Sequence, residues 1–269
     1  GNNGAAGKTW GTLLGVLGMP CNYARMPDVP AMLTGSEVEL FSDNDLKCLM
    51  KNGLILEGLA AEKLCQRGFS AELGIRAEPW KGPRVSFEQW GRVNLSPDVY
   101  YSRLTPVDPK VKIHSTLLHA KSGVSADSTE LGPAVTLFEN QSGGRVAVFA
   151  ATFGRSNLLT SFGFYDEDRK REILELLHFV CGKPVEFYYP GDAEVYLKVR
   201  RFADGRYLLA FFNLGHDELD RLPVNSAFTI ASVEAITPDG AWEQVDFADG
   251  CFQTPLFPAQ PKVFRVSAK

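Results

Sequence analysis

The chain has 269 residues, of which 45% are hydrophobic and 22% are charged. These proportions are typical of a globular protein, and the length allows two domains of ordinary size. The formal net charge of −4 and a pI near 5.7 argue against nucleic acid or an anionic membrane as partner, because no basic run offsets them. No segment approaches the roughly 20 consecutive apolar residues that a membrane helix needs.

Residues 53–68 form a strand–turn–helix unit around which the first part of the chain is organised. The apolar run 54–56 is too short for a helix and suits a strand buried on both faces. Gly58 permits a sharp turn, and Ala61, Leu64 and Cys65 then recur at helical spacing. Such turns are where open α/β sheets place nucleophiles, next to a helix N-terminus. Here the turn offers only Glu57, Gly58 and Leu59.

The segments before this unit predict a helix over residues 10–18 and a strand over residues 19–23. Ser42, with Asp45 three residues later, is a capping-box start for a second helix, which ends at Asn52 and Gly53. Because a doubly wound domain begins on a strand, we expect its first strand to lie upstream or to come from elsewhere.

The middle of the chain, residues 78–132, has a looser pattern, with short β-like pieces at 85–87, 99–101 and 112–119. Two clear strands follow at 134–138 and 145–150, joined by a turn rich in Asn, Ser and Gly. Residues 166–181 then predict a long helix whose apolar face consists of Ile173, Leu174, Leu177 and Val180.

After residue 184 the helical period disappears, and short strands alternate with Asp-Gly turns. This spacing predicts a small antiparallel β-sandwich over residues 184–269. For residues 5–183 we expect an α/β domain with a flavodoxin-like, doubly wound sheet of the class I amidotransferase type.

Cysteine catalysis and metal binding both lack support in the sequence. The five cysteines are scattered, and no pair has CxxC spacing. Cys48 precedes the buried strand, and Cys65 lies two turns into the helix that follows it, so neither can reach the turn at Glu57. We therefore interpret them as small buried side chains and expect no metal and no cofactor.

Carboxylates and aromatic side chains supply the remaining candidates. Glycoside hydrolysis needs two carboxylates roughly 5–10 Å apart in a cleft, but most acidic residues lie in turns or in first turns of helices. Glu57 is the one acidic residue in a suggestive position, and its simplest interpretation is a carboxylate bonded to neighbouring amides. Trp80 and Trp90 are candidates for stacking on sugar rings, although such side chains equally fill cores.

The order of these segments resembles the C-terminal accessory half of bacterial glycoside hydrolases of the β-galactosidase type. The resemblance covers most of the chain and consists of packing and turn motifs, at residues 10–14, 17–20, 45–47, 53–58, 60–64, 67–69, 73–75, 138–140, 143–146, 208–213 and 238–240. In that family a catalytic barrel precedes a glutamine-amidotransferase-like trimerisation domain and a small β-domain.

The resemblance implies a non-catalytic region that supports oligomerisation and shapes the substrate cleft of a carbohydrate-degrading enzyme. It implies an upstream catalytic barrel, a homo-oligomer and a carbohydrate ligand bound through the parent enzyme. No catalytic residue can be carried over, because the family's catalytic carboxylates belong to the barrel. Two alternatives stay open: a carbohydrate-binding module, and a divergent enzyme with an amidotransferase fold.

Overall fold

The computed structural model describes residues 10–22, 29–95, 97, 100–122, 127–153 and 167–269. Its contacts group into two units. Unit 1 comprises Gly1–Trp10 and Ala24–Lys183, and unit 2 comprises Gly11–Tyr23 and Pro184–Lys269. The domain limits 5–183 and 184–269 stay a prediction. In the part of the chain that the structure describes, no helix has both the length and the apolar character needed to span a bilayer.

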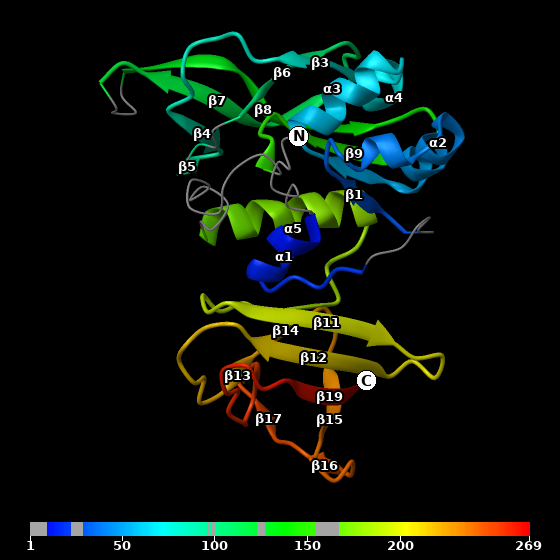
Figure 1. Ribbon diagram of the computed structural model, residues 1–269, viewed down its shortest axis with the longest axis vertical. Coiled ribbons are helices and arrows are strands. Elements are labelled where there is room, and N and C mark those ends of the chain that lie inside the picture. The colour runs from blue at the N-terminus through cyan, green and yellow to red at the C-terminus, as the bar shows by residue number, and fades with distance from the viewer. Residues whose placement is uncertain (1–9, 23–28, 96, 98–99, 123–126, 154–166) are drawn as a thin grey trace, which may run out of the picture. The chain divides into compact units, whose positions relative to one another are not determined.

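A curled seven-stranded sheet, with strand order β1-β2-β9-β8-β7-β4-β5, is the centre of unit 1 (Figure 1). A separate two-stranded sheet pairs β3 with β6. The strands are β1 (Ala31–Leu33), β2 (Leu54–Leu56), β3 (Ile75–Pro79), β4 (Phe87–Trp90), β5 (Val93–Leu95), β6 (Ser102–Pro106), β7 (Lys112–Ala120), β8 (Ser128–Glu139) and β9 (Arg145–Phe149). The helices are η1 (Val38–Leu40), α2 (Asp43–Asn52), α3 (Gly58–Gln66), α4 (Ser70–Leu73) and α5 (Glu167–Cys181).

The flavodoxin-like, doubly wound fold predicted for residues 5–183 is wrong. Among the described strands of this sheet, only β1, β2 and β9 pair in parallel, whereas β8, β7, β4 and β5 pair antiparallel. A parallel sheet needs a crossover helix between successive strands. The stretch from β3 to β9 contains strands and turns but no helix among its described residues. The segment that looked loose in the sequence, residues 78–132, in fact provides most of the antiparallel strands.

The parallel part of the sheet is covered on two faces. Leu54 and Leu56 of β2, with Val146 and Val148 of β9, belong to one core together with residues of α2 and α3. Strand alternation directs the intervening side chains, such as Ile55, to the opposite face. Helix α5 contacts β2, β9 and β5. The three apolar residues of β2 are all buried, which confirms the prediction of a buried strand.

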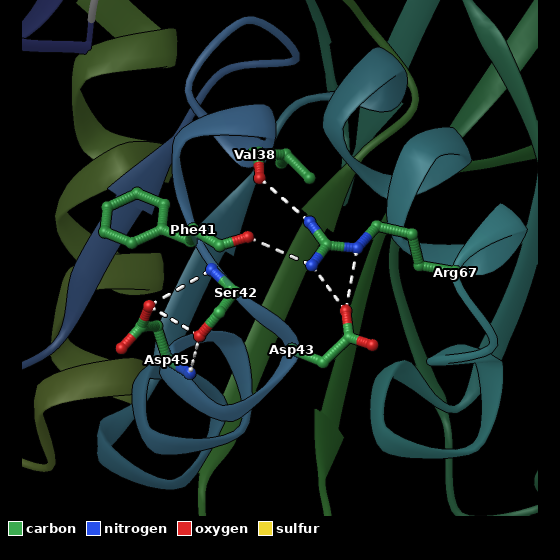
Figure 2. Close-up of polar contacts among 6 residues, drawn as sticks. All are labelled: Val38, Phe41, Ser42, Asp43, Asp45 and Arg67. Atoms are coloured by element: carbon green, nitrogen blue, oxygen red, sulfur yellow. Dashed lines mark hydrogen bonds and ion pairs between the residues drawn. The ribbon is translucent and has the colours of Figure 1, made fainter.

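The start of α2 is fixed by the predicted capping box, which is confirmed. The hydroxyl of Ser42 accepts the Asp45 amide at 3.2 Å, and the Asp45 carboxylate accepts the Ser42 amide at 3.0 Å (Figure 2). Arg67, which follows α3, donates to the carbonyl oxygens of Val38 and Phe41 at 3.0 Å each and to Asp43 (Figure 2). One guanidinium therefore joins the end of α3 to the segment that leads into α2.

Three expectations about individual elements fail. Residues 19–22 are not a strand, and Tyr23 lies outside the described residues. The first strand of the sheet is instead β1, whose three residues pair in parallel with β2. On α5 the fully buried apolar residues are Ile173 and Leu176, while Leu177 is only partly buried. The stripe is therefore displaced from its predicted phase.

Unit 2 consists of antiparallel sheets. Its largest sheet has the order β11-β12-β19-β15-β16, beside a three-stranded sheet β13-β18-β17 and a pair β10-β14. The strands are β10 (Phe187–Tyr188), β11 (Val195–Arg201), β12 (Tyr207–Asn213), β13 (Leu222–Pro223), β14 (Asn225–Ser226), β15 (Ile230–Ile236), β16 (Trp242–Gln244), β17 (Phe247–Ala248), β18 (Cys251–Phe252) and β19 (Lys262–Ala268).

Residues 11–22, which include all of α1 (Trp10–Val16) except Trp10, are held in unit 2 by close backbone approaches. A Cβ added to Gly15 would lie 2.4 Å from the ring of Tyr196, and one added to Gly18 would lie 2.7 Å from Cβ of Tyr189. The Tyr189 amide donates to the Gly18 carbonyl oxygen at 2.8 Å, and Lys198 donates to the carbonyl of Cys21 at 2.9 Å. Glycine is needed at both positions because the partner lies where a side chain would begin.

Candidate functional site

The carboxyl ends of the three parallel strands meet at one corner of unit 1, the position at which open α/β sheets bind ligands. The loop after β2 brings Glu57 and Gly58, and the loop after β9 brings Ala151 and Thr152. The Gly58 amide donates to the Ala151 carbonyl oxygen at 2.9 Å, and the Leu59 amide donates to Oγ1 of Thr152 at 3.1 Å. The amides of Gly58 and Leu59, the first two of α3, are thus hydrogen-bonded to other residues of the protein.

The corner is filled rather than hollow. A Cβ on Gly58 would lie 2.3 Å from the Ala150 carbonyl oxygen and 2.5 Å from Oγ of Ser102, which begins β6. Gly58 is the first residue of α3 and does not have a left-handed backbone. The requirement for glycine is therefore steric, and the closely packed atoms leave no room at this point for a reactive side chain.

The two glutamates at this corner are both buried and hydrogen-bonded. Glu57, 2% exposed, accepts the Gly35 amide at 2.8 Å, so the interpretation of Glu57 as a carboxylate bonded to a neighbouring amide is confirmed. Glu62, on α3, accepts the hydroxyl of Ser102 at 2.5 Å. Each carboxylate has a neutral donor, which is an arrangement for holding loops together.

A second polar cluster lies beneath α5 and was missed by the sequence analysis. It consists of Arg169 and Glu172 on α5, Glu88 on β4, and His114 and Ser115 on β7. The Arg169 guanidinium binds both oxygens of Glu88, at 3.1 and 2.6 Å, and also donates to Glu172. Ser115 donates to Glu88 at 2.6 Å. Both carboxylates and the guanidinium have side chains no more than 2% exposed.

A β-bulge explains why two consecutive residues of β7 reach this cluster. In a regular strand His114 and Ser115 would point to opposite faces. Ile113 pairs with Thr136 and Ser115 with Val135, so His114 is an extra residue on its strand. Bulges of this kind redirect side chains and are frequent near functional sites.

The charges of the cluster perturb its pKa values in opposite directions. Burial alone would raise the pKa of Glu88, but the charge and hydrogen bonds of Arg169 outweigh it and hold that pKa below its ordinary value. Burial raises the pKa of Glu172 to about 8; Arg169 opposes this rise and the negative charge of Glu88 adds to it. Burial also lowers the pKa of His114.

The predicted substrate-binding residues, Trp80 and Trp90, belong to different parts of unit 1. Trp80 follows β3; its Nε1 donates to the Pro83 carbonyl oxygen at 2.9 Å, and the Arg103 guanidinium lies 5.6 Å from its ring centroid. Trp90 ends β4 and lies 5.9 Å from the ring of His114. The contacts of the described residues do not bring the two tryptophans together, and their role in binding stays a prediction.

A surface groove of about 480 Å³ lies beside Trp80 and is lined by Glu78, Pro79, Lys81 and Arg103. Glu78 and Arg103 face each other across the β3–β6 pair. The groove therefore has one acidic and two basic side chains next to an aromatic residue, a combination that can hydrogen-bond polar ligands.

Thiol and metal chemistry gain no support from the described residues. Cys65 contacts the backbone of β3, with its Sγ 3.6 Å from the Ile75 carbonyl oxygen and 3.3 Å from the Ala77 amide. The ranges that the structure describes contain no group of three or more His, Cys, Asp or Glu side chains arranged to hold a metal ion. The amidotransferase-fold alternative is overturned together with the doubly wound sheet.

Comparisons with known proteins find similarity in structure only. No protein-family model matches the chain, and no curated protein matches it. The structure matches α-L-fucosidase isoenzyme 2 from Paenibacillus thiaminolyticus with a TM-score of 0.55 and 12% identity, over 90% of this chain and 40% of that one. The chain shares a fold with part of this fucosidase. It thus spans well under half of the length of the protein that it matches.

Weaker matches are two structures of the GH42 β-galactosidase Gan42B, one of them a catalytic mutant from G. stearothermophilus. Their TM-scores are 0.46 and 0.45, each with 12% identity. They cover 88% and 87% of this chain and 31% and 30% of those chains. These three structures are all of glycoside hydrolases.

Proposed function

We propose that this chain is a non-catalytic region of a glycoside hydrolase, which supports oligomerisation and shapes the carbohydrate cleft of a catalytic domain outside this sequence. The observation that carries the proposal is the filled corner at Gly58, where the backbone of Ala150 and the hydroxyl of Ser102 occupy the place of a reactive group. The shared fold with part of a fucosidase supports the link to glycosidases.

The buried carboxylates of unit 1 also favour a non-catalytic role. A glycosidase needs two carboxyl groups that face a sugar in a cleft. Glu88 and Glu172 are 1% and 0% exposed and are bound to one guanidinium, so no sugar can reach them in this conformation. Glu57 and Glu62 are likewise turned to internal donors.

The test is to assay the purified chain on a panel of aryl glycosides, with α-L-fucoside and β-D-galactoside included, and to measure its mass in solution by light scattering. We expect no turnover above the rate in buffer, and a mass that is a multiple of the 29.6 kDa chain. Turnover that survives repurification would overturn the non-catalytic assignment. A monomer at tens of micromolar would overturn the oligomerisation role alone.

The groove beside Trp80 favours one second candidate, a glycan-binding module. Sugar hydroxyls could bond with Glu78, Lys81 and Arg103 while the ring contacts the edge of Trp80. Titration of oligosaccharides against tryptophan fluorescence tests this candidate. We expect binding to weaken in Trp80→Phe and in Arg103→Gln, and to be unchanged in Trp242→Phe, which alters unit 2. The absence of any saturable change would exclude the module.

A further inference from the structure

Two buried polar atoms face each other in unit 1 without completing a hydrogen bond. Nε2 of His114, on β7, lies 3.9 Å from Oε1 of Glu172, on α5. Both atoms are shielded from solvent, and within the described residues neither has a hydrogen-bond partner. The Glu172 side chain is fully buried, whereas that of His114 is 12% exposed.

The charged groups around this pair come from several elements. Helix α5 contributes Arg169, bound to Oε2 of Glu172, and Glu175, whose Oε2 lies 4.0 Å from Nε2 of His114. Strand β4 contributes Glu88, which is held by Arg169 and by the hydroxyl of Ser115 on β7, and whose carboxylate also interacts directly with that of Glu172. Tyr101, immediately before β6, interacts electrostatically with Arg169. Glu175 is 60% exposed, so solvent screens its charge.

The buried cluster has an excess of one negative charge, which one added proton would neutralise. With Glu88 and Glu172 both ionised and His114 neutral, two negative charges share one positive charge in a site that is almost closed to water. An uncompensated buried charge is costly. One added proton makes the group of Arg169, Glu88, Glu172 and His114 neutral as a whole.

We propose that His114 and Glu172 share one exchangeable proton, and that this proton makes the packing of α5 against β4 and β7 pH-dependent. The proton can lie on Oε1 of Glu172 and be donated to Nε2 of His114, or lie on Nε2 and be donated to the carboxylate. Either form completes the bond between the two unpartnered atoms after a shift of about 1 Å, to a normal hydrogen-bond length.

The stability of the protein changes over a pH range whose upper end is the raised pKa of Glu172, about 8. In the unfolded chain the first proton of the pair belongs to His114, whose ordinary pKa is about 6.5. Between these values the folded protein holds a proton that the unfolded chain has released. A group with a raised folded pKa stabilises the protein at low pH, so stability falls as pH rises from about 6.5 to about 8. Below about 6.5 both states hold one proton, and the contribution levels off.

The test uses the full chain with Trp242→Phe, so that fluorescence reports unit 1, which holds the other three of the four tryptophans. Urea unfolding is measured at half-unit steps from pH 5.5 to 9. We expect the unfolding equilibrium constant to rise as pH increases from 6.5 to 8, by up to about tenfold per pH unit. A buried glutamine mimics the protonated acid, so Glu172→Gln should abolish this rise.

The matched control is Glu175→Gln, which removes a carboxylate equally near to Nε2 of His114 but largely exposed, and should keep the wild-type slope. His114→Gln removes the group that takes up the proton in the unfolded chain. Its stability should therefore keep increasing below pH 6.5, towards the ordinary glutamate pKa of about 4.3, where the wild type levels off. A wild-type slope that persists in Glu172→Gln overturns the proposal. If Glu172→Gln does not fold, the His114→Gln variant decides the question. If its stability levels off below pH 6.5, as that of the wild type does, the proposal is overturned.

Discussion

Two places in unit 1 each bury a pair of glutamates, and they satisfy them differently. At the corner after β2, Glu57 accepts the Gly35 amide and Glu62 accepts the Ser102 hydroxyl. Beneath α5, Glu88 and Glu172 share the single guanidinium of Arg169. Neutral donors fix a carboxylate through local geometry, whereas a shared cation makes two carboxylates depend on one side chain and on each other. The comparison predicts that the corner resists single changes better than the cluster does.

The largest effect is expected for Arg169→Met. It leaves the carboxyl groups of Glu88 and Glu172 buried without their shared cation, and breaking a buried ion pair costs about 3–5 kcal/mol. The free energy of unfolding, from urea titration at pH 7, measures this loss. Arg171→Met is the matched control, because Arg171 lies on the same helix and is 58% exposed, and it should cost less than about 1 kcal/mol. Equal losses in the two variants would contradict a special role for the shared guanidinium.

An intermediate effect is expected at the corner for Gly58→Ala. The new methyl group would lie 2.3 Å from the Ala150 carbonyl oxygen, a backbone atom that cannot move aside without displacing β9. Overpacking of this kind costs about 1–3 kcal/mol. Gly215→Ala serves as the control, since its methyl group meets only the Asn213 side chain at 3.2 Å. Unfolding free energies that are unchanged in Gly58→Ala would show that the corner has free space.

The smallest changes in stability are expected when one glutamate of each pair is replaced by glutamine, and the two replacements should differ in sign or size. Glu57→Gln replaces a charged acceptor by a neutral one at the Gly35 amide and should cost about 1 kcal/mol at pH 8, because bonds to charged groups are the stronger ones. Glu172→Gln at the same pH should cost nothing or stabilise, since it removes a surplus buried charge. Unfolding at pH 8 compares them directly, and a loss of equal size in both would erase the distinction.

Elements with strong local signals could be predicted from the sequence. The capping box of Ser42 and Asp45, the buried run of β2 and the turn between β8 and β9 depend on neighbouring residues, and all are present as predicted. Strand β1 was missed because three residues carry too little periodicity to be recognised. The antiparallel strands of residues 78–132 have only short and irregular signals in the sequence, whereas the βα unit at residues 53–68 has a strong local one, and this contrast favours the wrong fold.

The cluster beneath α5 could not be predicted for a different reason. Glu88 and Arg169 are 81 positions apart, and nothing local to either residue indicates the other. One signal was present: Arg169 and Glu172 are followed at helical spacing by Ile173, Leu176 and Val180, so charged residues continue the apolar stripe. The close packing around Gly58 could likewise not be predicted from the sequence, because Ser102 comes from a strand whose pairing depends on distant segments.

The approach of Gly15 to Tyr196 and of Gly18 to Tyr189 has a practical consequence for dissecting the protein. The polypeptide enters the second unit twice, once early and once after residue 183. Expression of residues 184–269 alone would therefore strip two tyrosines of the peptide that covers them and invite aggregation. A tethered fragment, with residues 11–22 joined through a flexible spacer to residue 184, restores that cover and is the better starting point for isolating this half.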